Sequence, residues 1–446
     1  MINRNLQNKT VGMVSLGCSK NQVDAERLLG ALRLAGYAIS SVAEDCGVVI
    51  INTCGFIESA KQEAIDTILE FAAKKQAGQI GGLIVTGCLS ERYREEFMAQ
   101  LPEVDGVLGI GKNAEIVVAV DAVLAGQKYC AFGEKEDLSL EGERMMVGES
   151  YTAYLKVAEG CDNRCSYCAI PDIRGRFRSR PIENILAEAR ELVKAGVVEL
   201  NLVAQDTTRY GEDIYGELAL PRLLERLCEI EGLGWVRLLY CYPERVTDRL
   251  LDVIAAQNKI VNYIDLPVQH ASGKVLSEMN RRGDAQSLTA LTQKIRAKIP
   301  DACIRTTLIT GFPGESEEDF EILAKFVKEI EFDRLGCFAY SQEEGTPAGE
   351  REDQLDEEVK RRRAEIIMET QARIAEQKAA QMIGKEIEIL VEGHDRQRRM
   401  SIGRSRADAP DVDGRVYYKG EAATPGSFVR VKVTGADGYD LIAERV

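Results

Sequence analysis

Three cysteines stand close together in the stretch EGCDNRCSYCAIP, with no fourth cysteine or histidine close behind. A closed structural zinc site needs four Cys or His ligands, and an electron-transfer iron–sulfur cluster normally has four cysteine thiolates. Three ligands leave one coordination position open, which is where a metal centre can bind and activate a second molecule. The spacing of Cys161, Cys165 and Cys168, the second trio, therefore predicts a reactive metal centre.

Another three cysteines are spread over the first ninety residues. Cys18, Cys54 and Cys88, the first trio, each close an apolar β-rich run, in SLGC, NTCG and TGCL, and each has a glycine beside it. In a parallel sheet the ligand site lies outside the carboxyl ends of the strands, so three strand-end thiolates could converge there. A single cysteine of this kind is more often a small buried residue, but the repeated pattern favours a shared metal site.

The composition limits the setting of this chemistry. The 446 residues are 45% hydrophobic and 29% charged, as in globular proteins, and no secretory leader or membrane-length apolar run is visible, so we expect a cytoplasmic protein without membrane contact. Twelve cysteines in a reducing compartment favour metal ligation over disulfides. Two histidines are too few for a site built on imidazoles. The net charge of -15 disfavours a surface that grips nucleic acid and suits a basic partner.

The elements that must position these cysteines follow a regular alternation. Strand-like and helix-like runs in residues 1–135 predict an open parallel α/β domain, followed by an acidic, turn-rich linker at 136–150. Six strand–helix units in 151–375 predict a partial (β/α)6 barrel related to the TIM type, with functional loops after the strand ends. Short strands and turns in 376–446 predict a small antiparallel β-barrel.

The second trio resembles the cluster motif of the radical S-adenosylmethionine (SAM) enzymes, which reads Cys-x3-Cys-x2-Cys at the start of a barrel. In that family SAM chelates the fourth iron of a 4Fe-4S cluster, and one electron releases a 5'-deoxyadenosyl radical. The segments TLITGFPGE and VAQDTTRYG look like the family's SAM-binding loops, although a turn or capping role is the alternative for the polar pair in the second of them. The resemblance implies cofactor-binding roles for Tyr167, Gln205, Asp206, Gly311, Pro313, Gly314 and Glu315.

A narrower resemblance covers essentially the whole chain. The methylthiotransferases join an N-terminal α/β domain with a three-cysteine cluster site, a radical SAM domain and a C-terminal TRAM barrel. The resemblance implies two 4Fe-4S clusters, an auxiliary one on Cys18, Cys54 and Cys88 that holds sulfur, and the SAM cluster on Cys161, Cys165 and Cys168. It also implies an electron donor and a sulfur donor.

Finer motifs separate the substrates within this family. The tRNA-modifying MiaB type reads Gly-Cys-Gln-Met-Asn at the first cysteine, whereas SLGCSKN is close to the Gly-Cys-Pro-Lys-Asn of the RimO type, with Ser19 in place of proline. CAIPDIRGRFRSRP, YIDLPVQHAS and GRSRADAPDVDG are also RimO-like. The resemblance implies methylthiolation of the β-carbon of an aspartate in ribosomal protein uS12, free or in the small subunit. The alternatives are a MiaB-like tRNA adenosine enzyme and a non-catalytic iron–sulfur or RNA-binding protein.

Arginine-rich stretches supply candidate contacts with substrate. In IRGRFRSRP, Arg174, Arg176 and Arg178 could bind the substrate aspartate or the SAM carboxylate through bidentate contacts. The run RQRRMSIGRSR is either a local RNA contact of the terminal barrel or a solvated charged face. The sequence leaves open which aspartate is modified, the reductant, the sulfur source and the oligomeric state.

Overall fold

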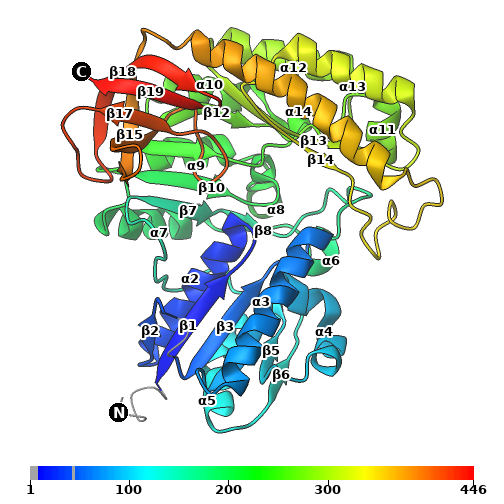
Figure 1. Ribbon diagram of the computed structural model, residues 1–446, viewed down its shortest axis with the longest axis vertical. Helices are drawn as coiled ribbons and strands as arrows, with labels where there is room; N and C mark the ends of the chain where they lie inside the picture. The colour runs from blue at the N-terminus through cyan, green and yellow to red at the C-terminus, as the bar shows by residue number, and fades with distance from the viewer. Residues whose placement is uncertain (1–8, 43–45) are drawn as a thin grey trace.

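The computed structural model describes residues 9–42 and 46–446, which form three units (Figure 1). The N-terminal domain is a parallel sheet in the order β2-β1-β3-β4-β5-β6. Its central strands β3 and β4 are buried at every position, which is why their sequences VVIINT and GLIVTG are almost continuously apolar. The strands are β1 (Thr10–Ser15), β2 (Ala38–Ser40), β3 (Val48–Thr53), β4 (Gly82–Gly87), β5 (Gly106–Leu108) and β6 (Tyr129–Ala131).

Helices cover both faces of this sheet. Apolar side chains of α3 and α4 pack on one face, and those of α2 and α5 pack on the other. The predicted open parallel α/β architecture is therefore confirmed. The helices are α2 (Ser19–Leu34), α3 (Glu58–Gln76), α4 (Cys88–Gln100) and α5 (Ile116–Leu124), with 3-10 turns η2 (Ile110–Glu115) and η3 (Lys135–Asp137).

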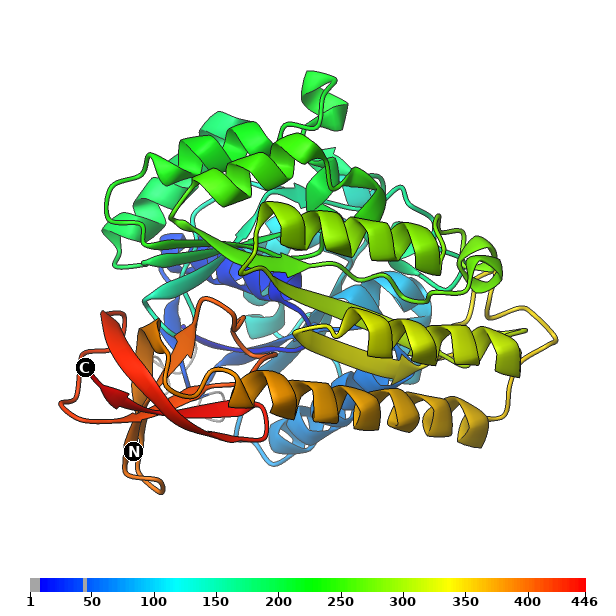
Figure 2. The same ribbon diagram turned by 90° about the horizontal axis from the view of Figure 1, so that it is seen from above.

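The central barrel is a second parallel sheet, in the order β14-β13-β12-β11-β10-β7, with its helices on the outside (Figure 2). The expected partial (β/α)6 barrel is confirmed. Its strands are β7 (Thr152–Lys156), β10 (Glu199–Val203), β11 (Trp235–Leu238), β12 (Ile260–Asp265), β13 (Cys303–Thr310) and β14 (Arg334–Ala339). Its principal helices are α7 (Ile182–Lys194), α9 (Leu220–Cys228), α10 (Asp248–Ala256), α12 (Ala285–Lys298), α13 (Glu317–Ile330) and α14 (Glu357–Ala380).

Shorter elements shape the loops of the central barrel. The strands β8 and β9 form an antiparallel pair that flanks the second trio. Helix α14 runs through the expected domain boundary at residue 375, because its apolar side chains pack on the central barrel and its end reaches strand β18. The short elements are β8 (Ala158–Glu159), α6 (Ile170–Arg174), β9 (Arg178–Ser179), η4 (Thr207–Arg209), α8 (Glu212–Tyr215), η5 (Pro243–Arg245) and α11 (Gly273–Glu278).

The C-terminal barrel closes in the order β15-β16-β17-β19-β18. Every pairing is antiparallel except that of β17 with β19, which is parallel and departs from the wholly antiparallel barrel that we expected. The reason is geometric, because an odd number of strands cannot alternate in direction all the way around a closed barrel. The strands are β15 (Glu386–Asp395), β16 (Met400–Ser405), β17 (Val416–Lys419), β18 (Phe428–Asp437) and β19 (Asp440–Arg445).

A buried ion network fastens the C-terminal barrel to the amino end of the central strands. Arg404 of β16 lies 2.6 Å from Glu199, the first residue of β10, and Arg237 of β11 lies 3.1 Å from the same carboxylate. Burial raises the pKa of Glu199, but the two guanidinium groups outweigh it and lower the pKa to about 2. The adjoining loop places Ala409 in an apolar cluster with Trp235, so the C-terminal barrel plugs the open end of the central one.

No helix among the described residues is long and apolar enough to cross a membrane.

The Arg404–Glu199 contact gives a stability prediction. Arg404→Ala leaves the buried Glu199 with one guanidinium partner fewer, which should lower the free energy of unfolding by about 3–5 kcal/mol in a denaturant titration. Arg430→Ala, which removes an exposed arginine from the same barrel, serves as the control and should change it by less than about 0.5 kcal/mol. Equal effects of the two substitutions would contradict the anchoring role.

Candidate active site

The first trio lies at one edge of the N-terminal sheet. Cys18 caps α2 directly after β1, Cys54 follows β3, and Cys88 begins α4 after β4, and these three strands are neighbours in the sheet. Gly17 has a φ of +90°, and a Cβ at this position would lie 2.7 Å from the Cβ of Cys54. The glycine beside the first cysteine is thus required for the cysteines to approach one another. The three cysteines therefore lie at the ends of neighbouring strands on one edge of the sheet.

The second trio lies in the loop between β8 and α6. The N–H of Cys161 donates to the carbonyl of Gly175, and that of Cys168 donates to the carbonyl of Cys165. Arg164 has a φ of +49°, and its carbonyl accepts a 2.8 Å hydrogen bond from the Asn280 side chain. These hydrogen bonds hold the loop in a defined bend.

Two side chains missed by the sequence analysis contact the middle cysteine of this loop. The Tyr242 hydroxyl lies 3.2 Å from the Cys165 sulfur, and Nη1 of Arg281 donates to the same sulfur over 3.9 Å. The Arg281 guanidinium also stacks on the Tyr242 ring. Neither residue lies in a recognisable motif, because both reach the site from separate loops of the barrel.

The pKa values of the thiols respond to burial and to nearby cations. Burial raises the pKa of Cys161 to about 11 and that of Cys54 to about 12. Burial also raises the pKa of Cys18, but the positive charges of Lys20 and Arg174 outweigh it, so this pKa lies below its ordinary value. A buried thiolate needs a compensating cation, and cationic iron supplies one.

The donor type of both trios fits an iron–sulfur cluster. Within residues 9–42 and 46–446, no group of three or more His, Cys, Asp or Glu side chains surrounds one metal-ion position. A four-iron cluster spreads its thiolates over separate iron atoms, so its ligands stand farther apart than those of one ion. The all-thiolate composition of both trios is also the usual ligand type of iron–sulfur clusters.

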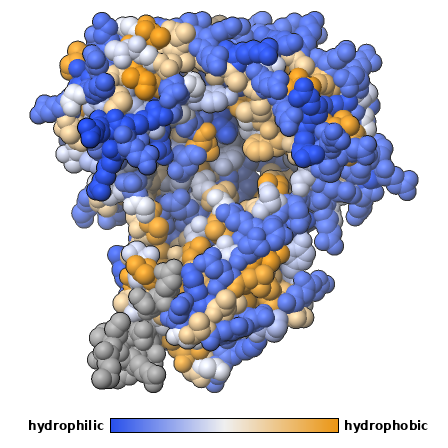
Figure 3. All heavy atoms as spheres, viewed as in Figure 1, coloured by the Kyte–Doolittle hydropathy of each residue, from blue (hydrophilic) through white to orange (hydrophobic). Residues whose placement is uncertain are grey.

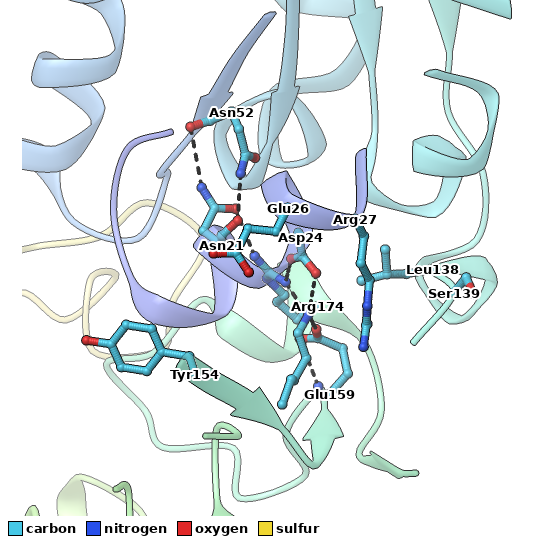
Figure 4. A network of polar contacts seen from close by, with 12 residues as sticks. Asn21, Asp24, Glu26, Arg27, Asn52, Leu138, Ser139, Tyr154, Glu159 and Arg174 are labelled. Atoms are coloured by element: carbon cyan, nitrogen blue, oxygen red, sulfur yellow. Dashed lines mark hydrogen bonds and ion pairs between the residues drawn. The ribbon is translucent and has the colours of Figure 1, made fainter. Parts of the chain in front are cut away.

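A buried ion network joins α2 of the N-terminal domain to β7, β8 and α6 of the central barrel (Figure 4). Asp24 of α2 pairs with Lys156 of β7 and, at 2.6 Å, with Arg174 of α6. Both cations also pair with Glu159, at 2.6 Å and 3.2 Å. Burial raises the pKa of Glu159, but Arg174 and Lys156 outweigh it and leave this pKa far below its usual range. The second nitrogen of Arg174 lies 3.3 Å from the sulfur of Cys88. The network therefore ties the first trio to the loop that carries the second.

Apolar packing brings the two trios together as well. Cys88 forms a buried cluster with Ala169 and Ile173, and Ala169 is the residue directly after Cys168. One face of the molecule is hollowed where the N-terminal domain meets the other two units (Figure 3).

The three arginines proposed from the sequence as substrate contacts have different surroundings. Arg174 is buried in the ion network, and Arg178 donates to the carbonyls of Lys135, Glu136 and Leu138, which fastens the linker. Both are thus occupied by acceptors of the chain itself. Arg176 is exposed and pairs with Asp162 at 2.8 Å, so it is the one of the three that faces solvent.

The polar pair after β10 divides into two roles. Asp206 is fully buried, caps η4 and accepts from Arg209, Thr208, Asn163 and Arg245, which is the capping alternative stated above. Gln205 donates a 2.7 Å hydrogen bond to Glu159, but its side-chain oxygen is buried without a partner among the described residues. An unpaired buried acceptor is costly, so Gln205 fits a donor from a bound cofactor.

The remaining cofactor candidates form ordered packing. Tyr167 packs against the core of the central barrel, and burial raises its pKa well above the usual value. Glu315 accepts hydrogen bonds from the backbone of Gly311 and Phe312 and from Arg363, while Pro313 is buried. A Cβ on Gly311 would collide with Lys360 of α14. Gly311 is therefore required for helix packing. A Cβ on Gly314 would lie too close to the side chains of Arg351 and Asp353.

Ser19 and Lys20 follow the first cysteine in α2. The Ser19 hydroxyl is buried without a hydrogen-bond partner among the described residues, so its replacement of proline leaves a polar atom unsatisfied. Lys20 is buried, and its ammonium lies 3.3 Å from the centre of the Tyr240 ring at the mouth of the central barrel. The sequence analysis assigned Lys20 no role, although it lies inside the SLGCSKN motif.

Three family descriptions match consecutive parts of the chain. Residues 10–109 match the uncharacterized protein family UPF0004, residues 155–327 match the radical SAM superfamily, and residues 383–446 match the TRAM domain. Their order is the one expected from the sequence.

Relatives match over almost the whole length. A protein of Pelotomaculum thermopropionicum is 50% identical over 439 residues, with 98% of this chain and 99% of the relative covered, and one of Desulforamulus reducens is 48% identical with 98% and 99% covered. Both are named ribosomal protein uS12 methylthiotransferase RimO. This chain belongs to the RimO family. It is a radical SAM methylthiotransferase.

Comparison with solved structures bears only on the fold of this RimO-family chain. The radical SAM methyltransferase TsrM from Kitasatospora setae, with cobalamin and a 4Fe-4S cluster bound, matches with a TM-score of 0.57 at 12% identity. The match covers 76% of this chain and 77% of TsrM. It supports the α/β domain followed by a partial barrel.

Two arginines of the RimO-like segment IRGRFRSRP provide a matched test of the ion network. Arg174→Met removes a buried partner of both Asp24 and Glu159 and should lower the free energy of unfolding by about 3–5 kcal/mol. Arg176→Met, two residues later, removes only an exposed ion pair and should have little effect. Thermal and denaturant unfolding of the two variants would check this, and similar midpoints would refute the role of the network.

Proposed function

We propose that this chain transfers a methylthio group to the β-carbon of an aspartate in ribosomal protein uS12. The observation that carries the proposal is the near full-length identity of 46–50% to proteins that bear this activity in their names. The adjacency of the two trios supports it, because Cys88 packs against the residue that follows Cys168. A sulfur-donating centre and a radical-generating centre need to act on one substrate carbon.

Both trios are proposed to hold 4Fe-4S clusters, the second with SAM bound to it. When bound, these groups supply the radical chemistry at the second trio and the sulfur at the first. The residues of the chain position them: Tyr242 and Arg281 fix the Cys165 sulfur, and Arg174 fixes that of Cys88. The unpaired oxygen of Gln205 is proposed to accept from the SAM amino group. An electron donor and a sulfur donor are further proposed partners.

Charge supports a protein substrate. The net charge of -15 favours long-range attraction to a basic ribosomal protein and repels RNA except at local patches. In the run RQRRMSIGRSR, Arg396, Arg398 and Arg399 are exposed at the turn between β15 and β16, whereas Arg404 is buried against Glu199. Any RNA contact of the C-terminal barrel is therefore proposed for this turn alone. The enzyme is proposed to be cytoplasmic.

The substrate assignment is tested by mass spectrometry. The holoenzyme, incubated with SAM, a reductant, a sulfur donor and uS12, should add a methylthio-sized mass to one aspartate peptide. A parallel reaction with unmodified tRNA is the control and should leave adenosine unchanged. Methylthio-adenosine in the tRNA together with unmodified uS12 would overturn the proposal in favour of a MiaB-like activity.

The two-cluster assignment is tested by iron content. Replacing Cys161, Cys165 and Cys168 together by alanine should leave about half of the iron after anaerobic reconstitution, since thiolates from different domains hold separate clusters. SAM cleavage to 5'-deoxyadenosine should cease in this variant. Replacement of Cys46, Cys228 and Cys303, which lie outside the trios, is the control and should retain all of the iron. Loss of all iron from the first variant would show that the clusters are not independent.

A further inference from the structure

Lys20 is a buried cation for which the described residues supply no carboxylate. The residue is 8% exposed, and its ammonium lies over the face of the Tyr240 ring rather than beside an acidic group. Taking an ammonium out of water without an ionic partner is costly. The position therefore requires an explanation beyond packing.

The other buried cations of this region have partners. Lys156 and Arg174 share Asp24 and Glu159, and Arg237 pairs with Glu199. Arg281 has no carboxylate but donates to the sulfur of Cys165. Lys20 pairs with no carboxylate among the described residues, and its ammonium interacts electrostatically with Tyr240 and with the sulfur of Cys18 two residues away.

The helix that carries Lys20 increases the cost. Lys20 is the second residue of α2, and the amino end of a 16-residue helix favours anions and disfavours cations. Burial and the helix dipole therefore both disfavour the positive charge of the ammonium at this position. Both would be relieved by an anion that binds beside the Lys20 ammonium.

Lys20 lies close to one cysteine of the first trio and to the end of the central barrel that carries the functional loops. Lys20 stands two residues after Cys18 of the first trio, and Tyr240 stands just beyond the carboxyl end of β11, where barrels of this type carry their functional loops. Tyr240 has a φ of +61°, a strained value for a bulky residue, and its N–H donates to Asp265 over 2.8 Å. The ammonium thus lies where the N-terminal domain meets the mouth of the central barrel.

We propose that Lys20 binds the side-chain carboxylate of the aspartate that is modified. This inference rests on the proposed function and names a substrate-binding residue for it. An ammonium–carboxylate contact is a charge-assisted hydrogen bond, and it would hold the adjacent β-carbon between the two trios. The Tyr240 ring supports the ammonium by a cation–π contact before substrate arrives. A neutral amide in place of the carboxylate offers Lys20 no charge to pair with.

The alternative is that Lys20 only balances the charge of the first trio. Arg174 already supplies a cation to this trio, 3.3 Å from the Cys88 sulfur. Within the described part of the chain, the Lys20 ammonium makes no hydrogen bond to the Cys18 sulfur and lies on the opposite domain's tyrosine. The two roles predict different responses when Lys20 is replaced.

The experiment compares two substrates on two holoenzymes. Dissociation constants are measured for uS12 and for uS12 in which the target aspartate is asparagine, with wild-type enzyme and with Lys20→Met. Wild type should bind the aspartate form about tenfold more tightly, and Lys20→Met should bind both forms equally, because hydrogen bonds to charged groups contribute an effect of this size. Methylthiolation should slow in Lys20→Met, while iron content and substrate-free SAM cleavage stay unchanged. Lys20→Arg should keep part of the preference.

Gln22→Met is the matched control, since it introduces the same side chain on the same helix without removing a charge, and it should keep the wild-type preference. Retention of the aspartate preference by Lys20→Met would overturn the inference, whether its clusters are intact or altered. Failure of the proposed function is seen separately, because wild-type enzyme would then leave uS12 unmodified.

Discussion

The ion network around Asp24 is the constraint on which the arrangement of the active site depends. Its carboxylate comes from α2 of the N-terminal domain, and its two cations, Lys156 and Arg174, come from the central barrel. Buried charges are tolerated only when their partners stay in place, so a shift of one domain against the other would leave several of these charges buried without a partner. The network therefore fixes the orientation of α2, and with it the position of Cys18 at the start of that helix.

This constraint explains why the two trios lie close together although they belong to different folding units. Arg174 pairs with Asp24 and Glu159 and also reaches the sulfur of Cys88, so the same guanidinium orders the domain interface and a cluster ligand. Arg281 likewise contacts a cysteine of the second trio, since it donates to the sulfur of Cys165. In both cases a buried guanidinium contacts a cysteine sulfur, and a cation at such a position favours negative charge on the sulfur.

The C-terminal barrel is attached by similar physics at the opposite end of the central strands. Glu199 and Arg404 form a buried pair there, and the loop with Ala409 fills the adjacent opening. The arginine-rich run of this barrel is consequently divided between a structural anchor and an exposed turn. The anchored half cannot contact RNA without breaking a buried ion pair, which is why sequence composition alone overstates the basic surface of this barrel.

The sequence by itself determined the cysteine trios, the three-unit order and the two parallel sheets, because these follow from local spacing and from the alternation of apolar runs. It also placed Cys18, Cys54 and Cys88 at one sheet edge, since parallel strands end together. Tertiary structure decided the rest. Arg174 and Arg178 read as substrate contacts in the chain, yet they are paired with acceptors far away in sequence. Lys20 and Tyr240 are 220 positions apart, and their contact exists only because buried ion pairs, which leave no local pattern, hold two domains together.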